Sequence, residues 1–231
     1  MRQHPIPLLL CFIFLAPPLQ AAVPTDDENW TVRKDEDGVR IATRSMDDSS
    51  FDAFRAETEL DSPMASLLAV MGEPESCLRW VHTCIEARAL GNGDFHHRYA
   101  YSVNALPWPA SNRDYVVRIT TEGDQQEVII TMEAVSGMEP EQRGLVRIEH
   151  SFSIYRITPL DDERTAIAWF QHTEPGGSLP GWLVNRMTTD LPYRSLLNLR
   201  DEVQKTRYRN YRIQYDDNGQ ITGLERDAED D

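Results

Sequence analysis

Histidine and tyrosine side chains with acid–base potential recur through the middle of the chain. In "FHHRYAYSV" the period of two places His97, Tyr99 and Tyr101 on one face of a predicted strand. His150 and His172 lie on two later predicted strands, which would bring them toward the same face. A converging cluster of this kind could supply a general acid and base. A small-molecule enzyme that uses His97, Tyr99 or His150 for acid–base chemistry is therefore the alternative function that we carry.

Other kinds of chemistry find little support. A zinc site needs three or four ligands, and no Cys or carboxylate spacing supplies them, so we expect no metal. No Gly-x-Ser-x-Gly motif occurs, and no cysteine lies near a plausible base. The segment "EPGGSLPG" (174–181) precedes a predicted helix, but a phosphate loop would need a lysine there, and none lies between Lys34 and Lys205. We expect no cofactor, and we interpret this segment as the turn that swings a long helix across a sheet.

Cys77 and Cys84 are the two cysteines that follow the N-terminal segment. Their spacing permits a disulfide across a bent segment. In a continuous helix the two residues would lie about 10 Å apart, which is too far for a disulfide. Two buried thiols are the other interpretation, and both stay open.

The first 22 residues are typical of a secretory signal peptide. Arg2 is followed by an apolar run from Leu8 to Ala16 and by the small residues Ala21 and Ala22. The run is shorter than the about 20 residues that a transmembrane helix needs. We expect cleavage and a periplasmic protein that has been secreted across the inner membrane. A protein tethered to the membrane by an uncleaved N-terminus is the alternative.

The chain is strongly acidic, with a net charge of −15. Phosphate backbones and anionic headgroups would be repelled, so we expect no nucleic-acid partner and no electrostatic attraction to anionic lipids. The last 16 residues (216–231) carry seven of the acidic side chains and one arginine.

The order of the predicted elements indicates an α+β protein. Two short strands surround a hairpin turn at Asp37-Gly38, and a third alternating strand leads to a helix from about residue 61 to residue 72. Five antiparallel strands follow between residues 95 and 173, and then one long helix from about Leu179 to Arg207, with Ser178 as N-cap and a kink at Pro192. We predict one ligand-binding domain over residues 23–207, followed by a hairpin and an acidic tail over 208–231.

Four motifs occur in order and resemble the START (steroidogenic acute regulatory-related lipid transfer) domains, bacterial branch. They are "CLRWVHTCIEARAL", "PWPASNRDYVVR", "EPEQRGLVRIEH" and "EPGGSLPGWLVNRM", and the resemblance spans roughly residues 30–206. It implies a helix-grip fold of the Bet v 1-like superfamily, in which a curved antiparallel sheet wraps a long C-terminal helix around an apolar cavity. It also implies that the cavity binds a lipid, fatty acid, phospholipid or sterol- or hopanoid-like molecule, for transfer or sensing in the cell envelope. Sterol-carrying members place an acid–arginine pair on adjacent strands, and here the strand that would supply the acid carries His97, Tyr99 and Tyr101 instead.

Carried onto this sequence, the helix-grip arrangement predicts a cavity wall and a lid. The predicted wall comprises His97, Tyr99, Tyr101, Val117, Ile130, Met132, Ile148, His150, Phe152 and Ile154. The predicted lid comprises Leu106, Pro107, Trp108, Leu179, Trp182, Leu183 and Met187. Arg113 and Asp114 would form a structural pair, or Arg113 would meet a lipid headgroup. We expect a monomer that contacts membranes transiently through apolar insertion of Leu106 and Trp108.

Overall fold

The computed structural model describes residues 29–177 and 179–227. The predicted signal peptide, the predicted cap at Ser178 and the last four residues lie outside them. The strands are β1 (Thr31–Glu36), β2 (Val39–Arg44), β3 (Ala53–Leu60), β4 (Cys84–Leu90), β5 (His97–Asn104), β6 (Asn112–Gly123), β7 (Val128–Ala134), β8 (Leu145–Arg147), β9 (His150–Pro159), β10 (Thr165–Glu174), β11 (Tyr211–Tyr215) and β12 (Ile221–Arg226). The helices are α1 (Met64–Gly72), α2 (Cys77–Trp80), α3 (Gly181–Asn185) and α4 (Leu191–Glu202). Short 3-10 turns occupy Pro74–Ser76 and Thr206–Tyr208.

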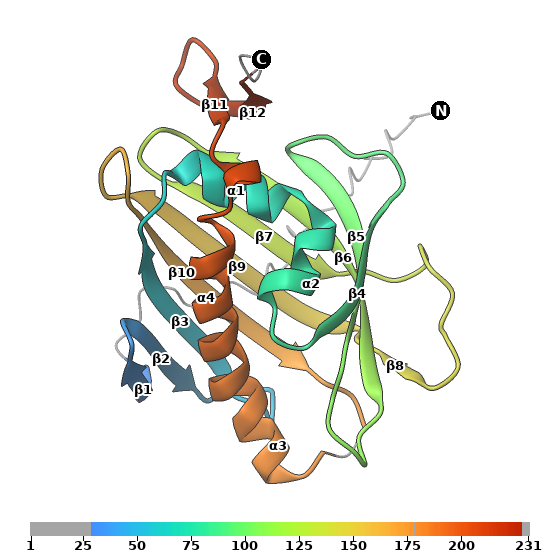
Figure 1. The fold of residues 1–231 in the computed structure, drawn as a ribbon. Coiled ribbons are helices and arrows are strands. Elements are labelled where there is room, and N and C mark those ends of the chain that lie inside the picture. The colour runs from blue at the N-terminus through green and yellow to red at the C-terminus, as the bar shows by residue number, and fades with distance from the viewer. Residues whose placement is uncertain (1–28, 178, 228–231) are drawn as a thin grey trace, which may run out of the picture.

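One curved sheet carries the fold (Figure 1), and its strands run in the order β1-β2-β3-β10-β9-β7-β6-β5-β4. The neighbours along this path are antiparallel, as the short connections predicted. The predicted hairpin at Asp37-Gly38 forms, and both residues have positive φ, as the favoured two-residue hairpin turn requires. The stretch from Leu145 to Ile157, predicted as one strand, is divided in the structure between β8, which runs parallel to β6, and β9.

Helix α4 lies over one face of the sheet, with α1 and α2 on the same side (Figure 1). We call this the inner face. Leu196, Leu199 and Val203 are at most 1% exposed and join the main core with side chains of α1 and of the inner face. Arg200 fastens the helix to the sheet, because it donates to the Thr58 hydroxyl at 2.7 Å and to the Asp37 carbonyl at 2.9 Å.

The final helix is broken, although the sequence predicts a single one. Between α3 and α4, residues Arg186–Asp190 form one π-helical turn. Pro192 explains the break, because it has no N–H to donate to the carbonyl of Thr188 in a regular helix. The irregular turn therefore lies directly before the proline at which the sequence predicts a kink.

Within residues 29–177 and 179–227, the C-terminal hairpin β11–β12 pairs only with itself, apart from an isolated bridge between Asp124 and Gln220. Its residues Tyr211, Ile213, Ile221 and Leu224 belong to or pack against the main core. In the described part of the chain no helix has the length and apolar character to cross a membrane.

Candidate ligand cavity

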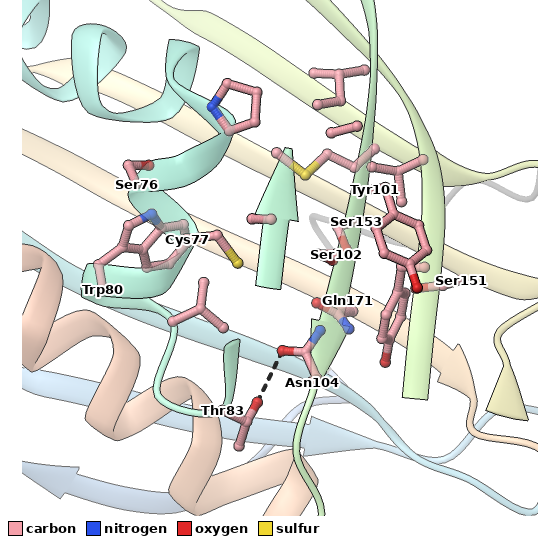
Figure 2. Close-up of a pocket in the computed structure, with 18 of the residues that line it drawn as sticks. Ser76, Cys77, Trp80, Thr83, Tyr101, Ser102, Asn104, Ser151, Ser153 and Gln171 are labelled. Atoms are coloured by element: carbon pink, nitrogen blue, oxygen red, sulfur yellow. Dashed lines mark hydrogen bonds between the residues drawn. The ribbon is translucent and has the colours of Figure 1, made fainter. Parts of the chain in front are cut away.

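A cavity of about 160 Å³ lies between the inner face of the sheet and the helices. Side chains from α1, α2, the strands β4 to β7, β9 and β10, and the turn before α4 form its wall (Figure 2). The apolar part of the wall comprises Met71, Pro74, Trp80, Val81, Ala87, Ala100, Leu106, Val117, Ile119, Met132, Met187 and Leu191. A second, polar part comprises Ser76, Thr83, Ser102, Asn104, Tyr115, Ser151, Ser153 and Gln171. Such a wall suits a largely apolar molecule with a few hydrogen-bonding groups.

The strand β5 turns a different set of residues inward from the predicted set. Its register with β6 pairs Ala100 with Val117 and Ser102 with Tyr115, and these four line the cavity. Because side chains alternate along a strand, His97 and Tyr99 lie on the opposite face, so their prediction as wall residues is wrong.

Tyr101 borders the cavity, but it belongs to the opposite face. Its ring packs with Leu90, Val103 and Val116 in a second, smaller core. Its hydroxyl donates to Asp114 at 3.3 Å, and burial together with that carboxylate raises the pKa of Tyr101 to about 12. The Tyr101 hydroxyl therefore forms its hydrogen bond on the outer side of the sheet and is not directed at the cavity.

The same alternation of side chains determines which residues of β7 and β9 face the cavity. Met132 pairs with Ser153, and both line the cavity. Ile130 pairs with Tyr155 and is buried in the main core, on the predicted face but beyond the cavity wall.

The phase of β9 is opposite to the prediction. Its inward residues are Ser151, Ser153 and Tyr155, so Phe152 and Ile154 face outward and His150 is exposed. Ile148 precedes the strand, is fully buried and donates its N–H to the Asp114 carbonyl at 2.9 Å, away from the cavity. These four residues do not form the predicted wall.

The residues predicted as a lid are divided between the cavity and the surface. Leu106 and Met187 line the main cavity. Pro107 and Leu183 line a neighbouring hollow of about 300 Å³, which shares Leu106, Met187 and Leu191 with the main cavity. At the surface, Trp108 is 90% exposed and Trp182 is 51% exposed. Leu179, just before α3, is half-buried.

Arg113 and Asp114 do not pair with each other, because they lie on opposite faces of β6. Asp114 binds Arg147 at 2.8 Å and accepts the Tyr101 hydroxyl, on the outer side. Arg113 faces the cavity and donates to the backbone carbonyls of Pro175 at 2.9 Å and Gly176 at 2.8 Å. It thus holds the glycine-rich turn, in which Gly176 and Gly177 both have positive φ.

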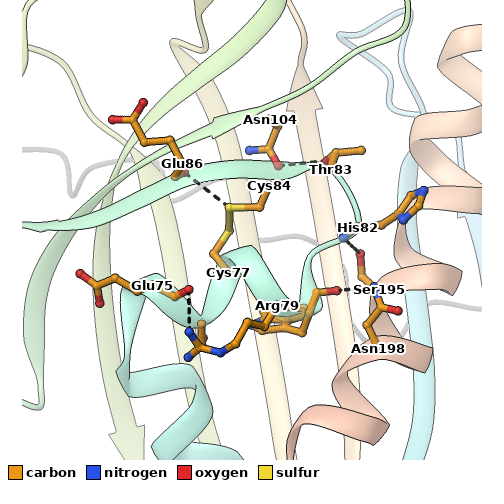
Figure 3. The surroundings of a disulfide bond; sticks show 12 residues. Glu75, Cys77, Arg79, His82, Thr83, Cys84, Glu86, Asn104, Ser195 and Asn198 are labelled. Atoms are coloured by element: carbon orange, nitrogen blue, oxygen red, sulfur yellow. Dashed lines mark hydrogen bonds between the residues drawn. A yellow bond between two sulfur atoms is a disulfide. The ribbon is translucent and has the colours of Figure 1, made fainter.

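Cys77 and Cys84 are joined in a disulfide, with their Cα atoms 5.9 Å apart (Figure 3). The bond ties α2 to β4, and Cys77 also lines the cavity. Two further contacts dock α4 onto this corner. The N–H of His82 donates to Ser195 Oγ at 3.0 Å, and Asn198 donates to the Trp80 carbonyl at 3.2 Å.

An aromatic cluster closes the apolar end of the cavity. Tyr155 stacks on Trp169 with ring centroids 5.3 Å apart, and Trp80 and Phe54 meet Trp169 edge-on at 5.9 and 4.9 Å. The indole N–H of Trp169 has no hydrogen-bond partner in the described part of the chain. Burial raises the pKa of the Tyr155 and Tyr115 hydroxyls, the latter to about 12, so both are uncharged donors at neutral pH.

The predicted histidine cluster for acid–base chemistry does not assemble. His97 and His150 are exposed, and His172 lies outside the cavity with its Nε2 3.6 Å from a Glu174 oxygen. Within residues 29–177 and 179–227, no group of three or more His, Cys, Asp and Glu side chains could hold a metal.

Known proteins are similar to this chain in sequence and in fold. Residues 19–191 match the START domain. The chain belongs to the START domain family. It is 31% identical over 179 residues to protein PA1579 of Pseudomonas aeruginosa, an alignment that covers 77% of this chain and 88% of the relative.

Two solved START structures show the same architecture. A STAR-related lipid transfer protein from Xanthomonas axonopodis is 28% identical, with a TM-score of 0.71 over 77% of this chain and 100% of that chain. Human STARD10 is 21% identical, with a TM-score of 0.70 over 79% of this chain and 76% of that chain, which supports the fold alone. The predicted fold class, an α+β helix-grip fold, is confirmed.

The cavity of this START domain is small. At about 160 Å³ it lies below the roughly 300–1,000 Å³ of typical small-molecule pockets. Met187 and Leu191 separate it from the neighbouring hollow, since both residues line the two spaces. A displacement of the π-helical turn that carries Met187 would join them.

Proposed function

We propose that this START domain binds a hydrophobic ligand of the lipid class in its internal cavity, and transfers or senses it in the cell envelope. The observation that carries the proposal is the mostly apolar cavity between the inner face of the sheet and the helices. The Xanthomonas relative is described as a lipid transfer protein, which supports the same class of activity. Burying apolar ligand surface contributes about 25 cal/mol per Å², so a cavity of this kind can hold a long-chain molecule firmly.

Entry of the ligand is proposed to occur between the loop 104–112 and α3. A ligand could not enter through the sheet, because backbone hydrogen bonds between its strands would have to break. Leu106 and Met187, in contrast, line the cavity from a loop and from an irregular helical turn, which can move more easily. The exposed Trp108 and Trp182 lie on these two segments. Tryptophan favours the interface between water and lipid, so transient membrane contact through this end is part of the proposal.

The cell compartment is a separate part of the proposal. The signal-peptide pattern of residues 1–22 supports export to the periplasm, with a tether through an uncleaved N-terminus as the alternative. A monomer is proposed as the working unit.

Native mass spectrometry of the protein purified from its own compartment tests ligand binding. We expect a mass excess that denaturation releases as a lipid. The variant Ala87→Trp should abolish the excess, because Ala87 lines the cavity and the indole would occupy the ligand space. Ala89→Trp is the matched control, since Ala89 is exposed on the same strand, β4. An Ala87→Trp protein that folds and retains the same lipid would contradict binding in this cavity.

A further inference from the structure

Arg113 is a buried cation without an anionic partner in the part of the chain that the structure describes. Its side chain is 3% exposed, and its three nitrogens donate to the carbonyls of Ser111, Pro175 and Gly176. Its sequence neighbour Asp114 faces the opposite side of the sheet and is bound to Arg147. The positive charge of Arg113 is therefore solvated by carbonyl dipoles but not neutralised.

The hydrogen-bonding capacity of Arg113 is not exhausted either. A guanidinium has five N–H donors, and the three carbonyls occupy three of them. A buried charge is costly unless it is paired, and an arginine fork matches a carboxylate in geometry. Burial lowers the pKa of Arg113, which reports the same unfavourable desolvation.

A second donor lies beside Arg113 on the cavity wall. Asn104 is its direct cross-strand partner on β5, and both residues line the cavity. Figure 2 shows Asn104 on the cavity wall. Thr83 donates to Asn104 Oδ1 at 3.0 Å, and the Asn104 amide nitrogen has no acceptor within the described residues. The charged arginine and the free amide thus form a donor pair at one end of the cavity.

Beyond this pair, apolar side chains line part of the cavity wall, beside the polar side chains of Ser153 and Gln171. Ile119 lines the cavity on the same strand as Arg113, six residues away, which is about 20 Å along an extended strand. Met132 lies opposite Ile119 on β7 and lines the same space. The small volume of about 160 Å³ favours one acyl chain over two.

Building on the proposed lipid-binding function, we propose that the ligand is a long-chain fatty acid. Its ionised carboxylate pairs with the Arg113 guanidinium and accepts a hydrogen bond from the Asn104 amide. Its single tail runs past Ile119 and Met132 toward the aromatic cluster.

The test compares oleate with oleyl alcohol, which has the same chain but no charge, by calorimetric titration of the wild-type protein. Oleate should bind at least about tenfold more tightly, as expected for a hydrogen-bonded charge pair. Equal binding, or tighter binding of the alcohol, would overturn the fatty-acid inference and leave lipid binding intact. Binding of neither probe would also overturn the fatty-acid inference, and native mass spectrometry of the purified protein tests the proposed function separately.

Arg113→Gln should reduce the preference for oleate over the alcohol to about one. Because Arg113 also holds the glycine-rich turn, the readout is the ratio of the two affinities within each protein, since a distorted turn would weaken both probes. Arg118→Gln is the matched control, because Arg118 lies on the same strand but faces outward, half-exposed beside Glu133. If Arg113→Gln still prefers oleate over the alcohol, Arg113 does not pair with the carboxylate, and the inference is overturned.

A second measurement needs no variant. The carboxyl carbon of oleate labelled with ¹³C should titrate at a lower pH when bound to the wild-type protein than in free oleate. An unchanged or raised pKa of the bound carboxyl group would show that no cation pairs with it, and would overturn the inference even if Arg113→Gln does not fold.

Discussion

Neutralising Glu202 should destabilise the fold in a manner that depends on pH. Glu202 ends α4 and is 1% exposed. It accepts hydrogen bonds from Arg79 at 2.7 Å, and from Lys205 and Arg207. Arg79 in turn donates to Tyr208 and Glu73, so the carboxylate joins α4, α2 and the segment after α1. Replacing it with glutamine removes the charge and leaves three cations around a neutral group.

The magnitude follows from the pKa of the carboxyl group. Burial would raise it, but the hydrogen bonds from Lys205, Arg79 and Arg207 outweigh burial and lower the pKa of Glu202 from 4.5 to about 2. A shift of one unit corresponds to about 1.4 kcal/mol, so the ionised group contributes about 3 kcal/mol to the free energy of unfolding at neutral pH. The folded pKa is lowered, so this contribution is present above the unfolded value and is lost as the pH falls. At pH 3 about 1.5 kcal/mol of it remains.

Urea unfolding of the wild type and of Glu202→Gln at pH 7 and at pH 3 measures this difference. We expect the variant to be less stable by about 3 kcal/mol at pH 7 and by about half as much at pH 3. Glu133→Gln is the control, because Glu133 is nearly half exposed beside Arg118 and should change stability by less than about 1 kcal/mol. A Glu202→Gln protein as stable as the wild type at pH 7, or a deficit that does not vary with pH, would refute the reasoning.

Three further predictions concern the disulfide, the lid and the N-terminus. Reduction of the Cys77–Cys84 disulfide should add two hydrogens to the mass of the protein. Cys84→Ser should lower the free energy of unfolding by about 2.5 kcal/mol, because the link to Cys77 is lost. Free thiols detected by alkylation under non-reducing conditions would contradict the disulfide. Trp108→Ala should slow lipid transfer between vesicles while thermal stability stays nearly unchanged, because Trp108 is 90% exposed, and transfer at the wild-type rate would argue against its lid role. N-terminal sequencing of periplasmic protein should begin near Ala22 or Val23, and an intact Met1 in the cytoplasm would exclude export.

The antiparallel pairing of consecutive strands and the turns could be predicted because each carries a local signal. The turn at Asp37-Gly38 needs residues that tolerate positive φ, and the break before Pro192 follows from a missing N–H. The division of β8 from β9 carries no such signal, because parallel pairing of β8 with β6 is a long-range contact. Arg113 and Asp114 are adjacent in the sequence, which suggests an ion pair. In the structure they lie on opposite faces of β6 and do not contact each other.

The faces of β9, like those of β5, were predicted wrongly for a physical reason. Phe152 and Ile154 are the apolar residues in the first half of β9, so the alternation rule assigns them to the core. In the structure Ile154 pairs with Phe170 on the outer face, where the ring of Trp30 lies 6.0 Å from that of Phe170. Apolar side chains thus occur on both faces of the sheet, and alternation alone cannot say which face encloses the cavity.

The polar residues on the inner face mark positions where stability of the fold and binding of a ligand favour different side chains. Aliphatic side chains at Ser153 and Gln171 would each contribute about 1.5–3 kcal/mol of burial free energy in a filled core. The chain instead places a hydroxyl and an amide there, beside the cavity and on the face that packs against α4. Such a conflict between local pattern and stable packing is expected at a functional site. The same argument applies to Arg113, whose buried charge costs stability in the empty protein and is offset once an anion enters.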